Sequence, residues 1–164
     1  MTETPSSLTN SFVAASPGID QELQRAAAIL RGTQRLLRAL NFESLSEVPL
    51  VNGRRADILA VGRDGAIWIV EIKSSIADFR ADQKWPDYRD YCDALLFAVA
   101  PDFPSDILPA DTGLIFADAY AGEVVRQAPH HPLSPARRKA LTLSIARMAA
   151  MRLHARLDVG IRLE

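Results

Sequence analysis

Two acidic residues and a lysine stand in strand-like stretches of the sequence that are otherwise apolar. Asp57 lies in the segment RRADILAV, and Glu71 and Lys73 end the segment AIWIVEIK. Side chains alternate across a strand, so Glu71 and Lys73 project from the same face. If the two segments pair as a hairpin, Asp57 and Glu71 converge on one site. Two converging carboxylates favour a hard divalent cation such as Mg²⁺.

The chemistry that such a site could perform is phosphodiester hydrolysis. A bound Mg²⁺ or Mn²⁺ polarises a phosphoryl oxygen and lowers the pKa of a bound water, which becomes a nucleophile near neutral pH. Lys73 would act as the base that orients this water, or would stabilise the charge that builds on the phosphate. The competing interpretation is a surface ion pair between Glu71 and Lys73 at a strand end, because an acid two residues before a lysine is a common pattern.

Other side chains could complete the same site. Glu47 faces away from Asp57 if a two-residue loop joins their strands, but a one-residue slip from a bulge would bring the two acids together. Gln83 and Lys84 follow the third strand, where a helix end could point toward the metal; a solvated helix face is the alternative. Glu22, in the first helix, is a weaker candidate.

Basic residues in two places are candidates for contacts to nucleic-acid phosphates. The candidates are Arg54 and Arg55 before the second strand, and Arg137, Arg138 and Lys139 at the start of the last helix. The segment 134–157 contains no acidic residue, and a solvated or partner-facing helix is the alternative to a DNA contact. Because this segment is also broadly apolar, we expect much of it to lie in the core.

The elements that must position these residues follow from periodicity and turn signals. Asp20 is a plausible N-cap for a helix over 21–40. Asn52-Gly53 and Asp64-Gly65 are turn signals that separate three strands. These strands are expected at 44–51, 54–61 and 66–73.

The second half of the chain has weaker but consistent signals. The segment 77–92 is helical in composition, and Pro86 predicts a break near Trp85. Ser134 and Pro135 predict the start of a long helix that runs to about residue 157. Further strands are expected at 93–100, 114–118 and 124–126. The resulting order, αβββαβββα, predicts an α/β protein with a mixed sheet and helices on its faces.

These motifs resemble a known superfamily and, within it, a narrower family. Asp57, Glu71 and Lys73 are similar to the D…ExK signature of PD-(D/E)XK nucleases, although Ala56 stands where that motif often has proline. The segments LSEVPLVNGRRADILAV, WIVEIKSS and ADFRADQKWPDYRDYCDALLFAV resemble the MmcB-like DNA repair proteins. The resemblance covers roughly residues 25–157. It implies a restriction-endonuclease-like core and a role in bacterial resistance to mitomycin C, which crosslinks DNA strands.

We therefore expect a metal-dependent DNA endonuclease that acts in repair. Its metal ligands would be Asp57, Glu71 and the backbone carbonyl of Ile72, with Lys73 as the base or the charge stabiliser. A DNA-binding or partner-recruiting module with little or no nuclease activity is the alternative, because a fold does not determine a function. RNA as the substrate is a third possibility that uses the same site.

Length, charge and composition restrict the classes of protein to which this chain can belong. The chain has 164 residues and a net charge of -1, so DNA contacts must come from a local patch rather than from a global field. We expect residues 1–18 to be a disordered leader and 19–164 to form a single domain. The single cysteine, Cys92, excludes an intrachain disulfide and fits a reducing, cytoplasmic location. We expect no membrane span, because the longest apolar run covers only 94–100, and no nucleotide cofactor, because a phosphate-binding glycine loop is lacking.

Overall fold

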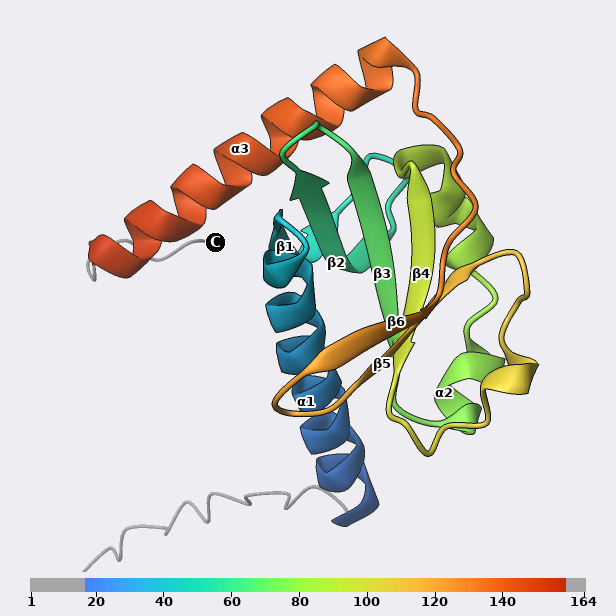
Figure 1. Cartoon of the computed structure of the whole chain (residues 1–164). Coiled ribbons are helices and arrows are strands. Elements are labelled where there is room, and N and C mark those ends of the chain that lie inside the picture. The colour runs from blue at the N-terminus through green and yellow to red at the C-terminus, as the bar shows by residue number, and fades with distance from the viewer. Residues whose placement is uncertain (1–16, 159–164) are drawn as a thin grey trace, which may run out of the picture.

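A six-stranded mixed β-sheet is the centre of the structure (Figure 1). The computed structural model describes residues 17–158. The strands are β1 (Phe42–Pro49), β2 (Arg55–Gly62), β3 (Ile67–Lys73), β4 (Ala94–Val99), β5 (Gly113–Ala117) and β6 (Gly122–Arg126). They lie in the sheet in chain order; β1, β2 and β3 are antiparallel, β3, β4 and β5 are parallel, and β6 is antiparallel to β5. The mixed sheet predicted from the sequence is confirmed.

Helices connect and cover the strands. They are α1 (Pro17–Ala39), α2 (Ile76–Ala81), α3 (Pro135–Leu157) and the two 3₁₀ helices η1 (Trp85–Tyr91) and η2 (Ser105–Ile107). Pro86 lies in the first turn of η1, so the helical segment breaks before Trp85 as predicted. Within residues 17–158, no helix is both long and apolar enough to cross a bilayer.

Helix α1 packs across one face of the sheet, where Ile29 and Leu37 are buried against β2 to β5. The close approach of α1 to the β5–β6 turn depends on Gly32, since a Cβ there would overlap the carbonyl oxygens of Asp118 and Ala121. The helix begins at Pro17, so Asp20 lies in its first turn and is not its N-cap. Residues 17 and 18 of the predicted leader over 1–18 therefore belong to α1, and its residues 1–16 lie outside the described residues.

The hairpin between β1 and β2 has a longer loop than the sequence predicted. The Leu50 N–H donates to the Arg54 carbonyl at 2.8 Å, and Val51, Asn52 and Gly53 form the turn, with Gly53 at φ +79°. A three-residue loop of this kind needs a residue in the left-handed conformation, which glycine adopts without strain. The expected strands, 44–51 and 54–61, left two residues for this loop, and the extra residue shifts the register by one.

Helix α3 begins as predicted but is covered much less than predicted. Ser134 caps it by accepting a hydrogen bond from the Arg137 N–H at 3.3 Å, and Pro135 is its first residue. Only Leu141 of this helix is buried, because α3 crosses one end of the sheet and continues past β1 (Figure 1). The expectation that much of α3 lies in the core was wrong.

Candidate metal centre

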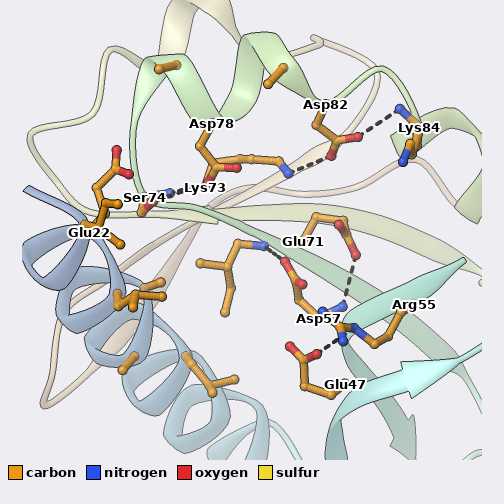
Figure 2. A pocket seen from close by; sticks show the side chains of 18 of the residues that line it. Glu22, Glu47, Arg55, Asp57, Glu71, Lys73, Ser74, Asp78, Asp82 and Lys84 are labelled. Carbon is orange, nitrogen blue, oxygen red and sulfur yellow. Dashed lines mark hydrogen bonds and ion pairs between the residues drawn. The ribbon is translucent and has the colours of Figure 1, made fainter. Parts of the chain in front are cut away.

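Asp57 and Glu71 lie next to each other where the pairing of β2 with β3 ends. That pairing runs from Val61–Ile67 to Ile58–Val70, and one step further along the register Asp57 faces Glu71. The Asp57 N–H donates to Glu71 Oε1 at 3.2 Å, and the Ile72 N–H donates to Asp57 Oδ2 at 2.8 Å (Figure 2). Each carboxylate thus binds the backbone of the opposite strand through one oxygen and keeps a second oxygen for other partners.

The surroundings of this carboxylate pair raise the pKa of both groups. Burial, and after it the neighbouring charge of Asp57, raise the pKa of Glu71 to about 8, against the hydrogen bond from the Asp57 N–H and the charge of Lys73, which lower it. Burial also raises the pKa of Asp57, against the hydrogen bond from Ile72. Two carboxylates this close cannot both be ionised cheaply in a buried site, so near neutral pH the pair holds a proton unless a cation replaces it.

Lys73 does not neutralise the pair, because its ammonium group is bound elsewhere. Its Nζ lies 2.6 Å from Asp82 Oδ2, and the Lys73 side chain is only 5% exposed. Burial disfavours the charged form of each partner, but the ion pair outweighs this effect: the pKa of Lys73 is raised and that of Asp82 is lowered. Lys73 is therefore a protonated ammonium. Asp82 follows the last residue of α2, and no feature of the sequence identified it.

Glu47 lies on the same side as Asp57, as the one-residue slip requires. The register pairs Ser46 with Ile58 on one side of it and Val48 with Ala56 on the other, so Glu47 is opposite Asp57. Its charge contributes to the raised pKa of Asp57. Of the two orientations that the sequence left open, the structure shows this one.

The backbone at Glu47 is left-handed, with φ +53°, which is uncommon outside glycine. Arg152 of α3 donates to the carbonyl oxygens of Ser46 at 2.6 Å and of Glu47 at 2.9 Å, and so supports this kink. The Glu47 side chain binds Arg55 Nε at 2.6 Å through Oε2. Helix α3 thereby helps to set the conformation of β1 beside the site.

The carboxylate pair opens into a cleft of about 900 Å³ between the sheet, α1 and α2. The α1 wall is largely apolar and includes Ile19, Leu23 and Leu30. The acidic side chains that line the cleft are Glu22, Glu47, Asp57, Glu71, Asp78 and Asp82, and the basic ones are Arg55, Lys73 and Lys84 (Figure 2). Acidic groups outnumber basic ones, so the cleft favours cations.

Gln83 and Lys84, the two candidates that follow α2, differ in their position relative to the cleft. Lys84 lines the cleft, and its backbone N–H donates to Asp82 Oδ1 at 2.8 Å. The Gln83 amide instead donates to the Arg80 carbonyl at 3.0 Å, and Gln83 is not among the described residues that line the cleft. Tyr88 also lines the cleft and donates its hydroxyl to the Arg55 carbonyl at 2.9 Å.

Most of the predicted phosphate-binding arginines are already engaged by the protein. Arg54 pairs with Asp87 at 2.7 Å, and Arg55 pairs with Glu47. Arg137 lies 5.0 Å above the Tyr91 ring. A role in DNA binding for these residues stays a prediction.

Arg138 has the most complete set of contacts. Its two terminal nitrogens bind the buried carboxylate of Asp93 at 2.6 and 2.7 Å, and one of them also donates to the Gly65 carbonyl at 2.7 Å. This guanidinium ties α3 to the sheet. Lys139, the next residue, is exposed.

Among residues 17–158, no three histidine, cysteine or carboxylate side chains converge into a ready-made metal cage. Asp57 and Glu71 nevertheless offer two oxygen donors at one point of an acidic cleft. Mg²⁺ is commonly held by one or two carboxylates, with water and phosphate as its remaining ligands. The donor set therefore fits Mg²⁺ or Mn²⁺.

Fold and cleft together define an α+β protein with a recessed acidic site at the end of two adjacent strands. Residues 15–159 match the family model described as DNA repair protein MmcB-like, and the chain belongs to this family of DNA repair proteins. The chain is also similar to a solved structure, the SPO1766 protein of unknown function from Silicibacter pomeroyi. The two are 46% identical with a TM-score of 0.80, over 85% of this chain and 96% of that one. No curated protein matches the chain.

Proposed function

We propose that this protein is a metal-dependent DNA nuclease of the PD-(D/E)XK type that works in the repair of damaged DNA, including crosslinks formed by mitomycin C. One observation carries the proposal. Asp57 and Glu71, from adjacent strands, form a recessed acidic pair, and Lys73 lies two residues beyond Glu71 in the same cleft. Its action on DNA would place the protein in the cytoplasm.

Asp57 and Glu71 would hold the cation, each through the oxygen that no backbone N–H engages. The Ile72 carbonyl is the expected third donor, because an extended residue directs its N–H and its C=O to the same neighbouring strand. Ile72 directs its N–H toward Asp57. When bound, the cation would polarise a phosphoryl oxygen and supply a water nucleophile near neutral pH.

Lys73 fits the role of charge stabiliser better than that of base. Its pKa is raised by Asp82, so it keeps its proton at neutral pH and cannot accept another. A fixed ammonium group can stabilise negative charge that develops on a phosphate during hydrolysis. In this proposal Asp82 is a positioning residue that holds Lys73 charged and in place.

DNA is the proposed substrate because the family is one of DNA repair proteins. The negative cleft would repel a phosphate backbone, so the cation is also what makes phosphate binding favourable. Lys84 on the cleft wall, and Arg55 if Glu47 releases it, are the nearest groups for phosphate contacts.

A DNA-binding module without nuclease activity is the second candidate, and one observation favours it. Each carboxylate already accepts a backbone N–H across the strands, and Lys73 already has Asp82 as its partner. A polar cluster with a purely structural role would have the same contacts.

The test is cleavage of single-stranded, duplex, branched and crosslinked DNA, and of an RNA strand, in Mg²⁺ or Mn²⁺. Glu71→Gln keeps an oxygen for the Asp57 N–H but removes an anionic ligand, so we expect cleavage to fall by about a hundredfold or more while DNA affinity persists. Glu43→Gln, which changes an exposed acid on β1, is the matched control and should cleave like the wild type. Equal cleavage by Glu71→Gln would refute the assignment of the site. A wild type that binds DNA but cleaves none of these substrates would establish the binding module.

A further inference from the structure

Helix α3 carries an apolar stripe that faces away from the sheet. Leu143, Leu153 and Leu157 are 55%, 59% and 76% exposed. Ala146 and Ala150 are also exposed and complete the stripe at alternating spacings of three and four residues. This is the heptad spacing of a helix–helix seam. We call these five residues the outer stripe.

The outer stripe is not needed to attach α3 to the protein. The opposite side of the helix packs against a buried apolar cluster that includes Val48 and Ile69 of the sheet. It does so through Leu141, Ile145 and Met148. Arg138 and Arg152 anchor the same side through Asp93 and the carbonyls of β1. The fold therefore leaves a second apolar surface on a helix that is already held in place.

Positive charge surrounds the outer stripe. Lys139, Arg147 and Arg156 are exposed, and α3 contains no aspartate or glutamate between its first and last residues. At 100° per residue, Arg147 and Arg156 lie on opposite flanks of the stripe and Lys139 lies at its N-terminal end. In a helix pair, residues on these flanks contact the flanks of the partner helix.

We propose that the outer stripe binds an amphipathic helix of a partner protein whose flanking residues are acidic. Leucines of that helix would pack beside Ala146 and Ala150, where the small side chains permit close approach, and its carboxylates would meet Arg147 and Arg156. A DNA backbone would leave the leucines exposed. A membrane surface favours a wide and bulky apolar face rather than a narrow seam with two central alanines. A second copy of this chain would bring like charges together.

Fluorescence anisotropy with a synthetic peptide tests the proposal. The probe is an amphipathic peptide about three heptads long, with leucine at the seam positions and glutamate on both flanks. We expect saturable binding that weakens by about tenfold or more when lysine replaces the flanking glutamates, and that weakens as salt rises. Equal binding of the two peptides, or no saturable binding of the glutamate peptide, would overturn the proposal.

Matched variants locate the binding surface. Leu153→Glu places a charge in the outer stripe and should weaken peptide binding by about tenfold or more. Ser144→Glu introduces the same charge at an exposed position of α3 outside the stripe and should bind like the wild type. Both variants should keep the wild-type thermal midpoint, since both sites are exposed. Self-association of the free protein, or binding to anionic vesicles or to a DNA duplex, that Leu153→Glu removes and Ser144→Glu does not would assign the stripe to that occupant and contradict the proposal.

Discussion

Asp93 and Glu71 are both buried carboxylates, 1% and 3% exposed, yet their pKa values are shifted in opposite directions. Burial alone would raise both pKa values. Asp93 accepts two backbone N–H groups and both terminal nitrogens of Arg138, which together lower its pKa to about 2. Glu71 accepts one N–H, at 3.2 Å, beside the carboxylate of Asp57, and its pKa rises to about 8. The difference lies in the donors and charges that surround each carboxylate.

The two carboxylates therefore do different things for the protein. Asp93 joins the start of β3, the segment before α3 and α3 itself through Ile67, Leu133 and Arg138. Asp93 therefore has a structural role: its hydrogen bonds and ion pair connect these three segments. Glu71 and Asp57 weaken the fold when both are charged, which is the behaviour expected of groups kept for a cation.

Loss of the ion pair between Asp93 and Arg138 should destabilise the protein most. Arg138→Met leaves Asp93 buried without its cation, and breaking a buried pair from one side costs about 3–5 kcal/mol of unfolding free energy. For a protein of this size we expect the thermal midpoint to fall by about 6–20 °C. Lys139→Met, at the neighbouring exposed position, is the control and should change the midpoint little. A similarly small change in Arg138→Met would show that Asp93 is not held by this pair.

The next effect is a pH dependence of opposite sign at the two sites. Glu71 keeps its proton in the folded, metal-free protein between its ordinary pKa of 4.5 and about 8, so the unfolding free energy decreases as pH rises through this window. Allowing for relaxation and water entry, we expect a loss of roughly 2–3 kcal/mol. In Glu71→Gln this loss should disappear, and the variant should be more stable than the wild type at pH 8.5 without metal. Thermal unfolding in a chelator between pH 5 and pH 8.5 measures it.

Asp93 should affect the pH dependence of stability in the opposite direction, at acidic pH. Its folded pKa is depressed, so its contribution is present above its ordinary pKa and is lost as pH falls toward 2. Asp93→Asn should remove stability at neutral pH and flatten the acid limb, while leaving the slope between pH 5 and pH 8.5. If Glu71→Gln and Asp93→Asn altered the pH profile in the same direction, the contrast between the two sites would be wrong.

The smallest effect is expected at the exposed pair of Arg55 and Glu47. Their side chains are 67% and 52% exposed, and such pairs contribute about 0–1 kcal/mol. Arg55→Gln should therefore shift the thermal midpoint by only a few degrees. Any loss of DNA affinity in this variant would reflect the loss of the phosphate contact of Arg55 rather than unfolding. A loss of stability comparable to that of Arg138→Met would contradict the ranking by burial.

The fold was largely predictable because its signals are local. The turn residues between the first three strands, the break at Pro86 and the Ser134 cap all act within a few residues, and the mixed sheet follows from their order. The exposure of α3 was not predictable in this way. An apolar helix that packs on a sheet and one that offers an apolar surface to a partner have similar compositions, and only the extent of the sheet decides between them.

The site was predictable to the extent that strand alternation determined it. Alternation and a hairpin were enough to place Asp57 beside Glu71. The position of Glu47 depended on one loop residue, which moves every side chain of β1 to the other face. The partners of Lys73 and Arg138 could not be predicted from the sequence, because Asp82 and Asp93 contact them only once the chain has folded.

Calorimetric titration of the metal-free protein with Mn²⁺ at pH 7.5 tests whether Asp57 and Glu71 bind a cation. We expect saturable binding at one site, with release of protons because the cation displaces the proton held by the pair. Glu71→Gln should lose this binding and its proton release, whereas Glu43→Gln should bind like the wild type. Saturable binding that Glu71→Gln retains in full, or a wild type that binds no Mn²⁺, would contradict the claim that Asp57 and Glu71 form a cation site.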